Sequence, residues 1–238
     1  MIIRELIQRV QSLYSMGVQS DDSRLSARHI YNKLKTLRLK YIVYQANKKE
    51  KISQWNFQTL PCVEMIPVPI HDCPCIPPLG CGVLRTKYPI PEPMTNRSRH
   101  LIQSVTSLEG SLILSEIGWN EIKYKTANKF TACKPDYFIR NGYLYILSLT
   151  HQTRQLRVIT ITALFEDSLV AEEFPNYCRE VENERDHCIS PLDRKFVVDP
   201  EFIDPIILEA SKELVDWFNQ QREDITNDSK DSLIEESK

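Results

Sequence analysis

The chain has 238 residues and carries 30 Lys and Arg against 32 Asp and Glu, a formal net charge of -2. That balance argues against a polyanionic or strongly nucleic-acid-binding chain, and only six glycines disfavour a glycine-rich phosphate-binding fold. The charge is nevertheless uneven along the chain. It is +7 over residues 1–51, +4 over residues 52–163 and -13 over residues 164–238. This gradient predicts at least two electrostatically different surfaces, each suited to a different partner.

The first segment, residues 1–51, is predicted to form a helical hairpin. Apolar residues recur at steps of three and four over residues 1–16, and Gly17 follows them as a C-terminal stop. Ser20 to Ser23 then offer N-cap candidates for a second helix, from Arg24 to about Lys48.

The middle of the chain is predicted to be extended. Residues 61–93 contain nine prolines, which exclude a helix and any long central strand, so residues 52–99 are interpreted as a proline-rich extended arm with short edge strands. Residues 100–200 form a β-rich region. Its clearest feature is Asn141-Gly142 between two aromatic runs, because a tight hairpin turn needs positive φ at both central positions.

The C-terminal third begins irregular and acidic. Asp199-Pro200 precedes a third amphipathic helix over residues 201–223, and residues 224–238 form an acidic flexible tail. Trp217 and Phe218 lie near the end of that helix. Helical periodicity cannot tell docking of these rings into a partner's groove from packing on the protein's own hairpin, so both interpretations stay open.

Seven cysteines, an odd number, are interpreted as free thiols in a reducing compartment. The main zinc candidates are His71, Cys73, Cys75 and Cys81, with Cys62 nearby, and a weaker group is formed by Cys178, His187 and Cys188. The closest pair of the main group, Cys73 and Cys75, is separated by a single residue, whereas structural zinc sites prefer two to four. The alternative is a proline-stiffened loop with buried thiols. No cofactor and no metal are therefore expected.

The sequence also lacks a catalytic constellation such as Gly-x-Ser-x-Gly or His-Glu-x-x-His, so no enzyme is predicted. No apolar stretch approaches the length that spans a bilayer, and no membrane partner is expected. The basic side chains of the hairpin are interpreted as partner contacts or, alternatively, as phosphate contacts. They are Arg24, Arg28, Lys35 and Arg38.

Three stretches together resemble a known family. They are residues 13–34 (LYSMGVQSDDSRLSARHIYNKL), residues 54–64 (QWNFQTLPCVE) and residues 73–81 (CPCIPPLGC). With the Asn-Gly hairpin and residues 164–167 (LFED), they resemble the ring protein below the portal of crAss-like tailed bacteriophages, a head-to-tail connector of the adaptor type. The resemblance covers residues 1 to about 222.

The resemblance implies a structural virion protein without catalysis. About twelve copies would form a ring at the portal vertex, joining capsid to tail and continuing the channel through which genomic DNA passes without sequence-specific contact. Its partners would be the portal, further tail or ring proteins and copies of itself, with assembly in the host cytoplasm. Leu214, Trp217, Phe218 and residues 223–238 would contact the portal.

The implied fold is α+β: an adaptor-like helical core, made of the hairpin and the C-terminal helix, with an inserted antiparallel β region. The runner-up function is a cytoplasmic interaction or nucleic-acid-binding module, also without catalysis.

Overall fold

The computed structural model describes residues 1–15, 25–68, 83–125, 134–147, 153, 155–178 and 190–216. The chain divides into two units. The helical unit comprises Met1–Ile52 and Ile189–Lys238, and the barrel unit comprises Ser53–Cys188. Within the described residues, no helix combines the length and the apolar character needed to cross a membrane.

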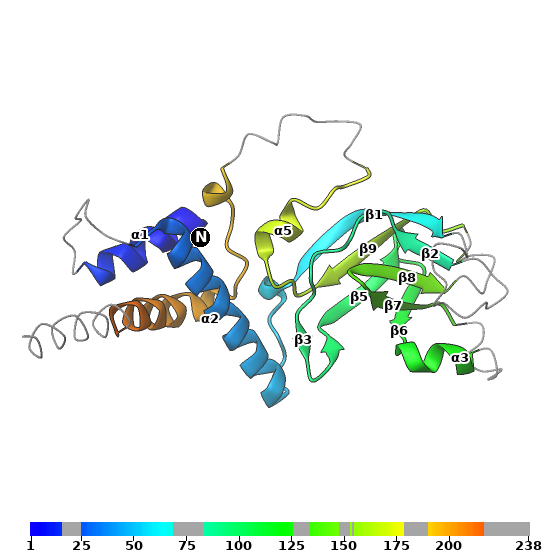
Figure 1. The fold of residues 1–238 in the computed structure, drawn as a ribbon, viewed down its shortest axis with the longest axis horizontal. Coiled ribbons are helices and arrows are strands. Elements are labelled where there is room, and N and C mark those ends of the chain that lie inside the picture. Colours follow the sequence, from blue (N-terminus) through cyan, green and yellow to red (C-terminus); the bar gives the residue numbers. More distant parts are fainter. Residues whose placement is uncertain are drawn as a thin grey trace, which may run out of the picture. The chain divides into compact units, whose positions relative to one another are not determined.

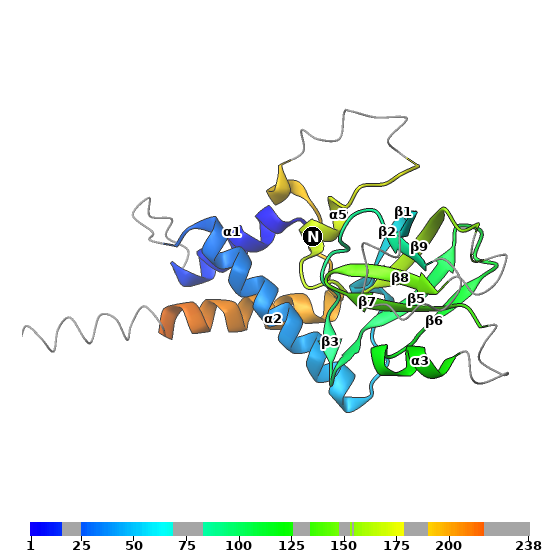
Figure 2. The ribbon, with the colours of Figure 1, turned by 45° about the vertical axis from the view of Figure 1, so that its right-hand side comes forward.

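The helical unit contains α1 (Ile3–Tyr14), α2 (Ala27–Lys48), the short 3-10 helix η5 (Pro191–Asp193) and a C-terminal helix over residues 200–216 (Figures 1 and 2). Each long helix buries one stripe of apolar side chains at the spacing expected of an amphipathic helix. The buried residues are Ile3, Leu6, Ile7 and Val10 from α1, Ile30, Leu34, Leu37 and Ile42 from α2, and Ile206, Ile207, Ala210 and Leu214 from the C-terminal helix.

The start of the chain is tied to the segment that precedes the C-terminal helix. The amide of Ile3 donates to the carbonyl of Arg194 at 3.0 Å, and the amide of Phe196 donates to the carbonyl of Met1 at 3.1 Å. Arg4 adds an ion pair to Asp193, with Nε and Oδ1 3.0 Å apart. Because these contacts join residues nearly 200 positions apart, no local sequence pattern predicts them.

The barrel unit is a closed barrel of seven strands in the order β1-β2-β8-β7-β6-β5-β9 (Figures 1 and 2). The strands are β1 (Gln58–Val68), β2 (Val83–Thr86), β5 (Ile102–Ser107), β6 (Ile113–Glu116), β7 (Asp136–Arg140), β8 (Tyr143–Leu147) and β9 (Val158–Ala163). Neighbours are antiparallel except β6 and β7, which are parallel. Alternation along β9 shows how the interior is filled, since Ile159, Ile161 and Ala163 are fully buried there.

Shorter elements complete the barrel unit. They are η1 (Gln54–Asn56), the two-stranded β3 (Thr95–Asn96) and β4 (Arg99–His100), η3 (Trp119–Glu121), α3 (Ile122–Lys125) and α5 (Ser168–Glu172). The interior core draws its residues from all seven barrel strands. A second apolar cluster, formed by Ile122, Phe138, Tyr145 and Leu147, lies on the outer wall, because the latter three alternate with interior residues along β7 and β8.

The expected fold class is wrong. The sequence predicted an adaptor-like helical core with an inserted antiparallel β region, whereas the strands close into a barrel with its own core and include a parallel pair. The physical reason is that closure depends on the pairing of β1 with β9, whose residues lie about a hundred positions apart, and period-two alternation does not reveal which strands pair.

The prediction that prolines exclude a long strand is also wrong, because β1 spans 11 residues. Pro61 falls where the register of β1 against β9 shifts, between Leu60 and Val63, so it occupies a bulge instead of a regular ladder position. Pro67 lies past the last residue that pairs with β9 and has a neighbour only in β2. Both prolines therefore stand where a missing amide hydrogen costs little.

The predicted Asn-Gly hairpin is confirmed. Asn141 and Gly142 have φ values of 50° and 77° and join β7 to β8. These are the left-handed conformations that a two-residue turn of matching twist requires.

Replacing Gly142 by Ala should destabilise the protein by about 1 kcal/mol, because a side chain at positive φ is strained. The added Cβ would itself meet only ordinary contact, 3.7 Å from Pro89 Cβ, so the cost is conformational. The measurement is the urea midpoint of unfolding. Gly118 has φ -67°, so Gly118→Ala should leave that midpoint nearly unchanged. Equal midpoints for the two variants would contradict this account.

A disulfide joins Cys62 to Cys178, with Cα atoms 5.7 Å apart, so the expectation of free thiols is wrong for this pair. Cys62 is buried in the bulge of β1, with φ 53°, and its carbonyl accepts from the amide of Tyr177 at 3.1 Å. The bond thus attaches the segment after α5 to β1. The two cysteines are 116 positions apart, a separation at which sequence alone does not reveal pairing.

Candidate functional site: a groove between two helices

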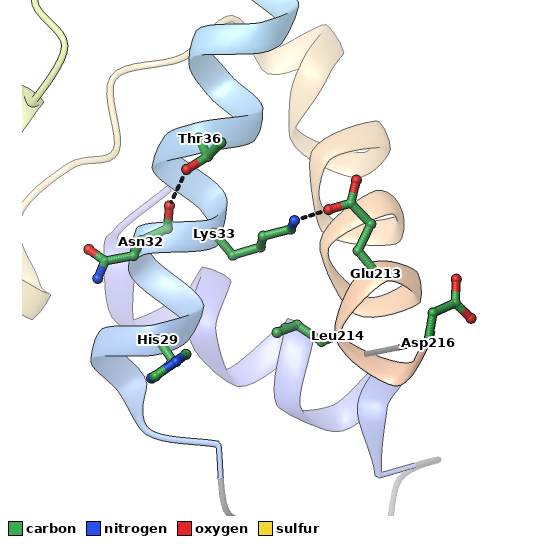
Figure 3. Close-up of a pocket in the computed structure, with 7 residues that line it drawn as sticks. All are labelled: His29, Asn32, Lys33, Thr36, Glu213, Leu214 and Asp216. Atoms are coloured by element: carbon green, nitrogen blue, oxygen red, sulfur yellow. Dashed lines mark hydrogen bonds and ion pairs between the residues drawn. The ribbon is translucent and has the colours of Figure 1, made fainter. Parts of the chain in front are cut away.

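The candidate site is a groove of about 550 Å³ in the helical unit, between α2 and the C-terminal helix (Figure 3). Its lining residues are His29, Asn32, Lys33, Thr36, Glu213, Leu214 and Asp216. Leu214 supplies a buried apolar floor, while Asn32 and Asp216 are exposed at the rim. An apolar floor within a polar rim is the usual anatomy of a protein-binding groove.

α2 is well defined at the end that carries the groove. Ser26 is its N-cap, and Ser26 Oγ accepts a hydrogen bond from the amide of His29 at 3.3 Å. Further along, Thr36 Oγ1 donates to the carbonyl of Asn32 at 2.9 Å. Because the first turn is capped, the side chains of His29, Asn32 and Lys33 are presented from a helix whose start is fixed.

Two ion pairs join α2 to the C-terminal helix. Lys33 pairs with Glu213 across the groove (Figure 3), and Lys40 Nζ lies 2.5 Å from Glu209 Oε1. The hydrogen bond from Lys40 is the largest cause that lowers the pKa of the Glu209 carboxyl, and a hydrogen bond from Tyr41 adds to it. The pKa of Tyr41 is raised, first by burial and then by the same carboxylate. The two helices therefore carry opposite charges where they meet.

These pairs make the stability of the helical unit pH-dependent. Since the folded-state pKa of Glu209 is lowered, its contribution is present above the unfolded pKa, near 4.3, and is lost as pH falls through the folded value. The Lys40 side chain is 63% exposed and that of Glu209 26%, so solvent screens the pair and its contribution is about 0.5 kcal/mol.

We expect Glu209→Gln to lose that contribution at pH 7 and to match the wild type at about pH 3 in urea titrations. Glu201→Gln is the matched control. Glu201 is an exposed carboxylate on the same helix that, within the described residues, has no ion-pair partner. A difference between wild type and Glu209→Gln that persists unchanged in acid would refute the assignment.

The predicted contact residues fall into three groups. Arg28 is exposed and Lys35 half-buried on α2, and Leu214 lies in the groove. Arg24, Trp217 and Phe218 lie outside the described residues. Of the seven groove residues, sequence reasoning identified only Leu214 as a contact. Among those it missed, Lys33 and Glu213 have only one sequence signal, which is opposite charge on two predicted helices far apart in the chain.

Arg38 differs from the other basic residues, because its side chain is only 1% exposed. Its Nε donates to the carbonyl of Val197 at 2.5 Å, which ties α2 to the segment before the C-terminal helix. Charge alone marked Arg38 as a surface contact, but its position four residues after Leu34 places it on the buried stripe.

The zinc candidates His71, Cys73, Cys75 and Cys81 lie outside the described residues. Among the residues that are described, no group of three or more His, Cys, Asp or Glu side chains is placed to hold a metal ion. The groove itself offers several kinds of binding chemistry. Its lining combines one cation, two carboxylates, two neutral polar side chains, an imidazole and an apolar floor.

Comparison with known proteins decides the family. Residues 5–233 match the family described as phage tail ring protein 2. The chain belongs to this family. It is also 28% identical over 223 residues to "Ring protein 2" of Bacteroides phage crAss001, covering 90% of each chain. The resemblance to a crAss-like phage ring protein, inferred from three short stretches, is therefore confirmed.

Family membership assigns the chain to the structural ring proteins of the phage virion tail. A ring of identical chains requires a heterologous interface, in which one surface of each copy complements a different surface of the next. Such a protein must therefore present at least two distinct contact surfaces, in addition to any that reach other components of the tail.

Proposed function

We propose that this protein forms the ring that lies below the portal, joins the capsid to the tail and continues the DNA channel, with about twelve copies in the ring. The observation that carries the proposal is the family match over residues 5–233. The protein acts without catalysis, at the portal vertex, after assembly in the host cytoplasm. DNA passes without sequence-specific contact.

The groove between α2 and the C-terminal helix is the portal contact in this proposal. It supports a role in docking because Leu214 offers an apolar floor next to charged groups, and the chain continues directly from it into Trp217 and Phe218. Tryptophan and other aromatic side chains are among the residues that most often dominate a protein interface. Arg28 and Lys35 extend the surface along α2.

Electron microscopy of intact particles tests the function directly. The expected result is density for this chain as a ring adjoining the portal and coaxial with it. Absence of the chain from the portal vertex would refute the proposal, as would a ring located only elsewhere in the tail.

The portal contact is tested separately by light scattering of the purified chain with its portal. Asp216→Lys reverses a charge at the groove rim and should weaken the complex, whereas Glu201→Lys makes the same change on the same helix outside the groove lining. Equal binding by both variants would exclude the groove as the portal contact. Steep salt-dependent binding of duplex DNA by the isolated chain would instead favour a nucleic-acid-binding module.

A further inference from the structure

The outer wall of the barrel carries two arginines that are stacked on aromatic rings. Arg140 on β7 lies over Trp119 of η3, with Cζ 4.1 Å from the ring centroid. Arg85 on β2 lies over Tyr143 of β8, with Cζ 4.6 Å from the centroid. Because Tyr143 is paired with Arg140 across β7 and β8, the four side chains form one continuous strip across three strands and η3. We name Trp119, Arg140, Tyr143 and Arg85 the arginine–aromatic strip.

The strip rests on a rigid base. Beneath it, Phe138 stacks on Tyr145 with centroids 5.0 Å apart, and Trp119 packs edge-on against Phe138 at 5.4 Å. Phe138 and Tyr145 are almost fully buried in the outer cluster. The guanidinium groups are thus held in place before any partner arrives, which reduces the conformational entropy lost on binding.

Neither guanidinium group has a carboxylate partner within the described residues. Arg85 Nε and Arg140 Nη1 are each buried and lack a hydrogen-bond partner there. Those two atoms are closed to an incoming partner, but both arginines are only half-buried, and the remaining edge of a planar guanidinium is best satisfied by a carboxylate or phosphate that accepts two parallel bonds. The strip therefore has the chemistry of a receptor for anionic groups.

The strip is not built to stack the bases of a single-stranded nucleic acid. Single-stranded nucleic acids bind by stacking their bases on open aromatic faces. Here the faces of Tyr143 and Trp119 already carry guanidinium groups, and Phe138 and Tyr145 are buried. What the strip presents is the donor edge of each arginine, which fits the carboxylates that the acidic C-terminal third of a second copy supplies.

We propose that the arginine–aromatic strip of one copy binds carboxylates from the C-terminal third, residues 164–238, of the next copy in the ring. The inference rests on the ring assembly proposed above and names one of its interfaces. A ring needs two unlike, complementary surfaces, and the chain offers them as a +4 segment that contains the strip and a -13 segment that follows it. Charge complementarity of this kind sets register and suppresses wrong contacts.

The decisive experiment is cryo-electron microscopy of the ring in the assembled tail. The expected result is a carboxylate from residues 164–238 of the neighbouring copy within hydrogen-bond distance of both Arg85 and Arg140. A map in which either arginine faces solvent, nucleic acid, another tail protein or residues 1–163 overturns the inference. Such a map still shows a ring, so its outcome is separate from that of the proposed function.

A matched pair of variants tests the contribution to assembly, measured as incorporation of the chain into tails. Arg85→Gln with Arg140→Gln should lower incorporation at least about tenfold, since truncation at a close interfacial charge pair usually exceeds that effect. Arg97→Gln with Arg99→Gln removes the same charge from exposed positions at the β3–β4 turn and should assemble normally. Equal incorporation of the two double variants contradicts the inference. Circular dichroism verifies that all variants are folded.

Discussion

Replacing Arg38 by Met is expected to destabilise the protein by about 2 to 3 kcal/mol. Methionine fills most of the volume of the arginine stem, so the loss is that of the polar contacts of the buried guanidinium, which include the hydrogen bond from Nε to the Val197 carbonyl. The measurement is the urea midpoint of unfolding, with the slope checked for constancy.

Arg28→Met is the matched control, because Arg28 lies on the same helix but is exposed. Its change should stay within about 0.5 kcal/mol. The comparison also separates two roles for Arg38. Unchanged stability together with lost portal binding would show that Arg38 is a partner contact, as the charge pattern of the sequence suggested.

The second large effect concerns the disulfide. Reducing the bond between Cys62 and Cys178 should cost about 2 to 4 kcal/mol of stability, because it releases a long loop in the unfolded chain. The expected observation is a lower urea midpoint of the wild type in reductant. Cys178→Ala should have that lower midpoint with or without reductant, and this insensitivity is the control.

Peptide mapping without reduction provides an independent measurement of the same bond. The peptides that contain Cys62 and Cys178 should appear as one linked species and separate on reduction. Quantitative alkylation of both thiols in the native, untreated protein would contradict the assignment.

Several parts of the helical unit and of the barrel could be predicted from the sequence because their causes are local. Apolar periodicity located α1 and α2, and the predicted turn at Asn141-Gly142 has both positive φ values. The same kind of local information gave the wrong prediction for β1, because it excluded a long strand there. Proline was weighed by its general effect on strands, whereas Pro61 lies in a bulge where the register of β1 against the distant strand β9 shifts.

The candidate groove was only partly accessible to prediction. Leu214 was identified by its place in an amphipathic pattern and does line the groove. Lys33 and Glu213 were not identified, because an ion pair between residues 180 positions apart has no periodic signature. Arg38 was assigned to a surface on the basis of charge, and burial reversed that placement.

The sequence by itself determined the family, the amphipathic helices and the hairpin turn, together with a charge gradient suited to a ring of unlike, complementary surfaces. The motifs shared with the family, the helical periodicity and the residues of the turn each involve positions close together in the chain. They can therefore be recognised in the sequence. Only the tertiary structure decided the closure of the barrel through β1 and β9, the disulfide, the burial of Arg38 and the arginine–aromatic strip. Each of these depends on segments far apart in the chain, which meet because apolar burial and strand pairing are satisfied over the whole fold and not locally.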